Sequence, residues 1–399
     1  MRRHVLGWIV GAACVGAVAV AVLATRHSSR ADGSPIDPRG GWHVAWIASC
    51  LAALALSGFA VLLGKRGVLT LKTALAVAVV VQMLPLAAPL LLSRDVYIYW
   101  ADARVLVVHG ANPYRSPPGR FAGDPGTRAA SPQWRTQTEA YGPVWAAAGS
   151  VPAAVAGTSG DAVQLGYRVL ALAGVLATIA VLSWRRQGAA AAVALVGWSP
   201  TVALHFTGGG HNDAFMVAVL TSALALGSRA TAGVLWPVSA LVKPLAAVVL
   251  PLDLAREHYR RPRRFWIALA GASVALAAAS IAVFGLRWVA RSTIAVHESS
   301  PIGGVHFLVE AGLQHRYAVA LAGLAFLVVY GLLLRTAWRR GRAHLGFAAA
   351  ALCMCVSQLR PWYALWPLAL SGLEGGAVDE SAAFALAAYV LVADALPVF

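Results

Sequence analysis

Long apolar runs separated by short polar connections fill most of the 399 residues of the chain. Three early runs, at residues 4–24, 44–64 and 71–92, are each long enough for a helix that crosses a bilayer, which takes about 20 residues. The first of them has a basic start like a signal peptide, but it is long enough to span and predicts a helix. The alternating segments of about 10 residues that mark a membrane β-barrel are missing from the sequence. Further crossings are predicted at about 161–184, 188–206, 211–227, 265–286, 317–335, 344–358 and 380–397.

Two regions interrupt this series of crossings. In the first, residues 96–108 predict a helix that ends before Gly110, and a segment rich in Pro, Gly and Arg follows it. The apolar residues 143–157 are too few for a comfortable crossing, so we expect a helix that lies in the interface or dips in and returns. In the second, short pieces at 230–242 and 244–254 meet at a lysine, and half-length helices with a charged break are typical of a site within a membrane protein. The pattern predicts an all-α, polytopic integral membrane protein with 11–13 transmembrane helices.

The charge distribution sets the expected orientation. The net charge of +16 would suggest nucleic acid in a soluble protein, but 59% of the residues are hydrophobic and the densest Lys and Arg groups lie between apolar runs. The positive-inside rule explains such groups as cytoplasmic links, so no nucleic acid partner is expected. On this orientation residues 93–160 and 287–316 form two extracytoplasmic loops. The predicted domains are an N-terminal transmembrane hairpin at 1–70 and a second transmembrane domain at 71–399.

Two carboxylates follow the third apolar run. Asp95 and Asp102 are seven residues apart, about two helical turns, so both lie on one face of the predicted helix with Tyr99 between them. A partly desolvated carboxylate binds protons more tightly, which suits it to take a proton from a hydroxyl. The structural alternative is that Asp95 caps the helix through backbone N–H groups and that Asp102 pairs with an arginine.

The sequence GGGHND stands at the start of the predicted crossing 211–227. Its glycines let the backbone approach a ligand, and His211, Asn212 and Asp213 fall at a helix N-terminus, where anions and metals both bind. The alternative is that Asn212 or Asp213 only caps the helix. His211 and Asp213 alone do not make a metal site, because no third ligand is identifiable nearby in the sequence. We therefore predict no metal-ligating residues and no cofactor. A bound divalent metal is compatible with the sequence, but no motif in it supports one.

Two cationic groups complete the candidate site. Lys243 lies within LWPVSALVKPLAAVVLPL, where a lysine is costly unless it meets water or an anion; snorkelling to the surface is the alternative. Arg360 is a second candidate for the same anion, beside Trp362 and Tyr363, and its alternative is an interfacial arginine in an aromatic belt. Ionisable groups at membrane depth cost roughly 2.5 to 3.5 kcal/mol each, so several on one side indicate a hydrated cavity.

Five motifs in this order resemble a known superfamily. The chain is similar, over roughly residues 71–371, to the bacterial GT-C glycosyltransferases that use polyprenyl-phosphate sugars, especially the actinobacterial mannosyltransferases that build lipomannan and phosphatidylinositol mannosides. The motifs are RDVYIYWADARVLVVHGANPY, YGPVW, GGGHNDAFM, LVKPLAAVVLPL and RPWYALWPL.

The resemblance implies a GT-C catalytic domain at 71–399 whose first extracytoplasmic loop carries the catalytic aspartate, which maps onto Asp95. It implies an inverting glycosyltransferase in which Asp95 deprotonates the acceptor hydroxyl, while Lys243 first and Arg360 second stabilise the departing phosphate. The substrate-binding candidates are Tyr99, Asp102, His211, Asn212, Asp213, Trp362 and Tyr363.

The expected activity is transfer of a sugar, most simply mannose, from a polyprenyl-phosphate donor to a hydroxyl of a glycolipid or lipoglycan acceptor. The expected location is the bacterial plasma membrane, among its lipids, with the active site on the extracytoplasmic side. The alternative function is a transporter or flippase for a lipid-linked or anionic substrate, in which the break at Lys243-Pro244 would gate the path and Asp95 would relay protons.

Overall fold

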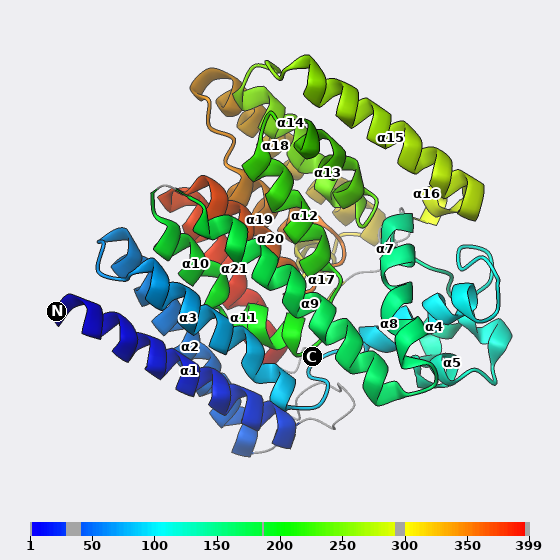
Figure 1. Cartoon of the computed structure of the whole chain (residues 1–399), viewed down its shortest axis with the longest axis horizontal. Coiled ribbons are helices and arrows are strands. Elements are labelled where there is room, and N and C mark those ends of the chain that lie inside the picture. The colour runs from blue at the N-terminus through cyan, green and yellow to red at the C-terminus, as the bar shows by residue number, and fades with distance from the viewer. Residues whose placement is uncertain (1, 29–40, 186, 292–299, 396–399) are drawn as a thin grey trace.

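A computed structural model describes residues 2–28, 41–185, 187–291 and 300–395 (Figure 1). Helices and their connections make up this part of the chain, and no β-strand occurs in it. The predicted all-α fold is therefore confirmed.

The N-terminal helices pack closely on the centre of the molecule. Helices α1 (Arg2–Ser28) and α2 (Gly41–Lys65) lie against each other, and they contact α3 (Leu71–Met83) and α10 (Ala189–Gly197). Small residues make these contacts close, as is common between membrane helices. A Cβ atom on Gly64, for example, would come within 2.9 Å of three atoms of Ala191.

The segment after α3 forms a compact unit at one end of the molecule (Figure 1). Arg104 donates to both carboxylate oxygens of Asp124, at 2.8 and 2.9 Å, and both side chains are buried. Burial raises the pKa of Asp124, but hydrogen bonds from Arg104, His109 and the Gly126 N–H outweigh it and hold the pKa below its usual value. This ion pair joins two parts of the predicted first loop. The short η1 (Leu84–Ala87) continues α3 and packs on α1 and η3 (Ala203–Thr207). The elements of the unit are α4 (Asp95–Val107), η2 (Pro118–Phe121), α5 (Pro125–Ala129), α6 (Pro132–Arg135), α7 (Pro143–Ala148) and α8 (Ser150–Ala156).

The predicted landmarks of this loop are present. Helix α4 ends close to the expected position, and Gly110 follows it with φ at +58° in the left-handed region that favours glycine. The apolar residues 143–157 form the two short helices α7 and α8 instead of one crossing helix.

Broken helices form the middle of the chain. After the long α9 (Gly160–Ser183), α10 is followed by a bend of 47° and a π-helical turn, η3 (Ala203–Thr207). The predicted half-length pieces are also seen, because Leu241, Val242 and Lys243 separate α13 (Ala230–Ala240) from η4 (Pro244–Val248). Such breaks put backbone and polar side chains inside the helix bundle. The remaining elements here are α11 (Pro200–Val202), α12 (Asp213–Leu226) and α14 (Val249–Arg256).

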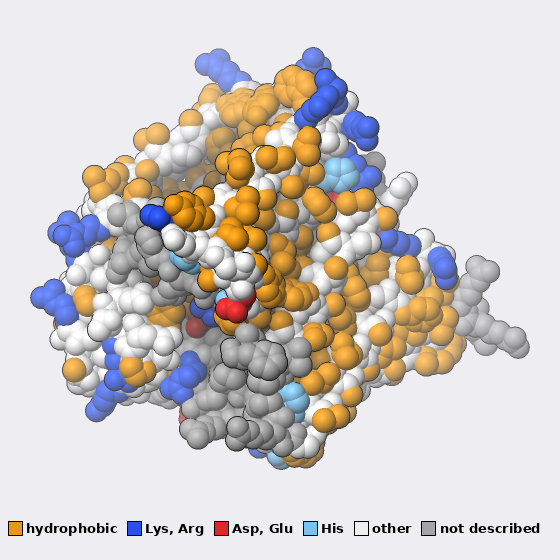
Figure 2. Space-filling view, turned by 180° about the vertical axis from the view of Figure 1, so that it is seen from behind, with side chains coloured by type: hydrophobic (Ala, Val, Ile, Leu, Met, Phe, Trp, Pro, Cys, Tyr) orange, Lys and Arg blue, Asp and Glu red, His pale blue; other side chains and the backbone are white. Residues whose placement is uncertain are grey.

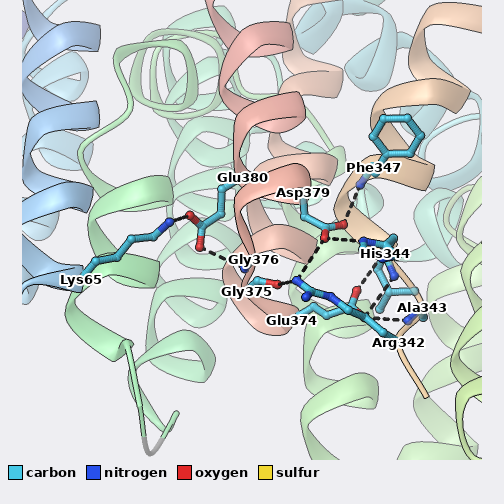
Figure 3. A network of polar contacts seen from close by, with 11 residues as sticks. Lys65, Arg342, Ala343, His344, Phe347, Glu374, Gly375, Gly376, Asp379 and Glu380 are labelled. Atoms are coloured by element: carbon cyan, nitrogen blue, oxygen red, sulfur yellow. Dashed lines mark hydrogen bonds and ion pairs between the residues drawn. The ribbon is translucent and has the colours of Figure 1, made fainter. Parts of the chain in front are cut away.

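A partly buried polar network holds the C-terminal helices together (Figure 3). Glu374 accepts hydrogen bonds from the backbone N–H groups of residues 343–345, at the start of α19. Asp379 is fully buried and lies 2.9 Å from the His344 ring, while Glu380 pairs with Lys65 at the end of α2. The elements of this part are α15 (Arg263–Phe284), α16 (Arg287–Arg291), α17 (Gly304–Glu310), α18 (His315–Arg340), α19 (Leu345–Cys355), η6 (Pro361–Ala364), α20 (Leu365–Glu374) and α21 (Ala377–Ala395).

The helix lengths agree with a polytopic membrane protein but give fewer full spans than expected. In the described residues, five helices are long and apolar enough to cross a membrane, or six if the bent pair around residue 198 is one span. The predicted count of 11–13 is higher than helix length supports, because crossings such as 211–227 and 344–358 are helices of only 14 and 11 residues. Figure 2 shows a broad apolar surface on one face of the molecule. Residues 292–299 of the predicted second loop lie outside the described part of the chain.

Candidate active site

Asp95 begins helix α4. The N-cap position belongs to Arg94, so Asp95 does not take the capping role that the sequence left open. The Asp95 backbone N–H donates to the Ser93 hydroxyl oxygen at 3.2 Å, and the Asp95 side chain is 24% exposed. Leu92, just before it, has φ at +58°, a strained conformation for a residue with a side chain. The Leu91 N–H donates to Gly208 O, which ties this turn to the GGGHND segment.

His211 lies beside Asp95. Its Nδ1 atom is 3.6 Å from an Asp95 carboxylate oxygen, and its ring stacks on Trp362 with centroids 3.6 Å apart. Gly210 allows this approach, because it has φ at +74° and a Cβ atom there would meet Val96 of α4 at 2.5 Å. The histidine is fully buried between these groups. The glycines therefore let this segment approach α4, whereas the sequence led us to expect an approach to a ligand.

Lys243 has an anionic partner within the chain. Its Nζ atom donates to Asp213 Oδ2 at 2.6 Å, and the Trp366 indole N–H donates to Asp213 Oδ1 at 2.9 Å. The Asp213 side chain is fully buried, and that of Lys243 is 10% exposed. The helix-capping alternative for this segment is not seen, because the N-cap residue Asn212 makes no side-chain cap bond. The sequence predicted an anionic partner for Lys243, and in the structure this partner is the carboxylate of Asp213, 30 residues earlier in the chain.

Aromatic rings surround the ammonium group. Lys243 Nζ lies 5.0 Å from the Tyr141 ring centroid and 5.3 Å from that of Tyr363, within the range of a cation–π contact. Tyr141 in turn packs edge to face on Tyr99, at 5.4 Å. Residues from α4, the loop before α7, the break after α13 and η6 therefore converge at one place.

The charges of this cluster act on Asp95. Burial raises the pKa of Asp95 above its ordinary value, and the positive charges of Arg360 and Lys243 oppose this rise without cancelling it. The two cations differ in their partners. Lys243 is paired with Asp213, whereas the Arg360 side chain has no ion-pair or hydrogen-bond partner in the described part of the chain. Arg360 therefore carries a positive charge that an incoming anion can use.

Asp102 faces a different neighbour. It lines a small cavity together with Glu139 and Trp145, and both carboxyl groups are buried. Burial raises the pKa of Glu139 to about 7, although the Tyr141 and Ala140 N–H groups bond to it. Tyr99 separates the two places, since it lines this cavity and also contacts Tyr141. The structure groups Asp102 with Glu139, about two helical turns along α4 from Asp95.

Sequence reasoning missed three residues of this region: Tyr141, Glu139 and Trp366. Tyr141 is held in place because the Gly142 N–H donates to Val242 O at 3.0 Å and the Val144 N–H donates to Leu241 O at 3.1 Å. The Gly-Pro pair in YGPVW was a signal of such a close backbone approach. Trp366 lies in the motif RPWYALWPL but was not singled out there, and Glu139 had no comparable local signal.

The described residues contain no group of three or more His, Cys, Asp or Glu side chains that could hold a metal ion. We therefore assign no residue to a metal.

Comparison with known proteins bears on this cluster. Residues 5–255 match the family described as "Alpha-(1->6)-mannopyranosyltransferase, N-terminal domain". The chain belongs to this family. The matched segment includes Asp95, His211, Asp213 and Lys243, while Arg360 lies beyond it.

Individual relatives carry the same name. The chain is 28% identical over 353 residues to Alpha-(1->6)-mannopyranosyltransferase A of Mycobacterium tuberculosis, a match that covers 76% of this chain and 67% of the relative. It is 33% identical over 178 residues to the A enzyme of Corynebacterium glutamicum, covering 41% of this chain and 34% of the relative. With the B enzyme of that organism it shares 26% over 338 residues, 71% of this chain and 55% of the relative. The chain thus spans from a third to two thirds of the length of these relatives, and no solved structure matches it.

Proposed function

We propose that this chain transfers mannose from a polyprenyl-phosphate donor to a hydroxyl group of a glycolipid or lipoglycan, on the extracytoplasmic side of the bacterial plasma membrane. The observation that carries the proposal is one cluster in which a carboxylate, Asp95, lies under the influence of two cations, Arg360 and Lys243. The family supplies the sugar, since its members are named as mannopyranosyltransferases.

In the proposed reaction Asp95 is the general base. It takes the proton of the acceptor hydroxyl while that oxygen forms a bond to C1 of the mannose, and the bond from C1 to the phosphate oxygen breaks. The bonding electrons leave with the phosphate group, whose added negative charge needs a cation nearby. Attack from the side opposite the phosphate inverts the configuration at C1.

Arg360 is the better candidate for direct contact with the donor phosphate. Its guanidinium group has no protein partner in the described residues, and a planar guanidinium binds phosphate through two parallel hydrogen bonds. Lys243 is already bonded to Asp213, so its charge is largely balanced before a donor arrives. We assign the leaving phosphate to Arg360 first and Lys243 second, the reverse of the order that the sequence suggested.

The remaining cluster residues supply walls for the sugar. His211 and Trp362 form one stacked wall beside Asp95, and Tyr99, Tyr141 and Tyr363 form another around Lys243. Aromatic faces suit the apolar faces of a sugar ring because they bury area with few rotatable bonds.

The test uses purified protein with polyprenyl-phosphomannose and a mannoside acceptor. Asp95→Asn should lower kcat by at least about 100-fold, the usual contribution of a general base. The matched control is Asp161→Asn, because Asp161 is an exposed carboxylate near the start of α9 whose side chain, among the described residues, bonds to Gln164 alone; its kcat should stay within about twofold of the unaltered protein. Full turnover by Asp95→Asn would remove Asp95 from its role. Movement of the lipid donor across vesicles without any transfer would favour a flippase instead.

A further inference from the structure

Asp213 is buried, and both of its carboxylate oxygens bond within the protein. One carboxylate oxygen accepts from Lys243 at 2.6 Å and the other from the Trp366 indole at 2.9 Å, and the side chain is 0% exposed. A side chain with no exposed surface does not contact a ligand from outside the protein. We expected from the sequence that Asp213 binds substrate, but its burial indicates a different role.

The contacts of Asp213 fix its orientation. The Ser239 hydroxyl of α13 donates to Met216 O of α12, which joins the helix that carries Asp213 to the helix before Lys243. The Trp366 ring stacks on Tyr363 at 4.8 Å, so the indole N–H that reaches Asp213 is itself held. A carboxylate supported from two elements gives its cation a defined position.

The ammonium group of Lys243 is held from three sides. Asp213 of α12 binds it, Tyr141 covers it from the loop before α7, and Tyr363 covers it from η6. Its charge also acts on Asp95. A flexible lysine side chain loses rotamer entropy when it is ordered, so this cost is met before any donor binds.

We propose that Asp213 is a positioning residue that acts through Lys243, holding the ammonium group at the edge of the cluster so that it meets the phosphate of a lipid-linked donor without first having to be ordered. This inference rests on the proposed function, because the phosphate belongs to the mannosyl donor. The inference predicts that loss of the Asp213 carboxylate lowers kcat/KM for the donor and leaves KM for the acceptor unchanged.

A purely structural ion pair would behave differently, and the chain offers one for comparison. Asp253 is 1% exposed and pairs with Arg261 at 2.9 Å, and it belongs to α14. None of the site residues described above contacts this pair in the described part of the chain. Asp253→Asn is therefore the matched control for removal of a buried, paired carboxylate.

The experiment measures kcat and KM separately for polyprenyl-phosphomannose and for the mannoside acceptor. We expect Asp213→Asn to lower kcat/KM for the donor at least tenfold while KM for the acceptor stays within threefold. Asp213→Glu, which keeps the charge, should recover part of this loss. Trp366→Phe removes only the second hydrogen bond and should lower donor kcat/KM by a smaller factor. Asp253→Asn should lower the melting temperature but keep donor kcat/KM within threefold.

A double-mutant cycle tests whether Asp213 acts through Lys243. If it does, Asp213→Asn combined with Lys243→Ala should be no worse for donor kcat/KM than Lys243→Ala alone, because interacting residues are not additive. Multiplication of the two single effects would overturn the inference, and so would equal effects of Asp213→Asn on donor and acceptor. If Asp213→Asn does not fold, Trp366→Phe in the same cycle decides. Absence of transfer by the unaltered protein would instead overturn the proposed function, and this inference with it.

Discussion

Alanine at Gly142 should damage the active site while the surrounding helices stay folded. Gly142 and Val144 bond through their N–H groups to the carbonyl groups of Val242 and Leu241, directly before Lys243. A Cβ atom at position 142 would lie 1.9 Å from Leu241 O and 2.5 Å from Leu241 C, where real Cβ atoms essentially never come closer than 3.0 Å. Both contacts are with backbone, so no change of side-chain rotamer relieves them.

The size of the effect follows from this overlap. The two backbone segments must separate by about 1 Å, and overpacking of this kind typically costs about 1 to 3 kcal/mol. Loss of the two backbone hydrogen bonds adds about 1 kcal/mol each. Tyr141 is the neighbour of Gly142, and its ring centroid is 5.0 Å from Lys243 Nζ. The separation of the two segments therefore moves the Tyr141 ring relative to the Lys243 ammonium group. A misplacement of about 1 Å in an active site costs on the order of 100-fold in rate.

Gly123→Ala is the control, because Gly123 belongs to the same loop and a Cβ atom there would meet nothing within 4 Å. The assay is mannosyl transfer together with thermal unfolding in detergent. We expect Gly142→Ala to lower kcat/KM by about 100-fold and the free energy of unfolding by about 3 to 5 kcal/mol, and Gly123→Ala to change neither. Near-normal kcat/KM in a folded Gly142→Ala protein would refute the reasoning, since the close approach would then not be needed to place Tyr141.

Two further predictions concern charge. Arg360→Ala should lower donor kcat/KM by about 100-fold, as for loss of one donor to a developing anion; the pKa of Asp95 should also rise further, so that the acid limb of the pH–rate profile moves to higher pH. An unchanged acid limb would contradict the influence of Arg360 on Asp95. Because burial raises the pKa of Glu139 to about 7, its neutral form is favoured in the folded state. That stability is complete below the ordinary pKa of 4.5 and is lost as pH rises through about 7, by up to about 3 kcal/mol. Glu139→Gln should flatten this dependence of the melting temperature on pH, and an unaltered slope would count against it.

The sequence alone determined the class of the protein and several local features. Apolar runs of about 20 residues require helices in a membrane, since every backbone polar group must be satisfied within its own segment. The position of Asp95 after such a run and the Lys243-Pro244 break are equally local, because proline lacks the N–H of a helix hydrogen bond and disfavours helical backbone in the residue before it, and a lysine is costly alone in an apolar segment. Both features are seen at the expected positions.

The tertiary structure decided which side chains meet. A spacing of seven residues puts Asp95 and Asp102 on one helix face. The packing of the other helices decides their neighbours, which are His211 for Asp95 and Glu139 for Asp102. The partner of Lys243 likewise depended on the packing of α12 against α13. Helix periodicity fixes the direction of a side chain relative to its own helix, whereas its neighbours depend on the rotation and depth of every other helix. Those are set by contacts between small residues far apart in the chain, which no local pattern contains.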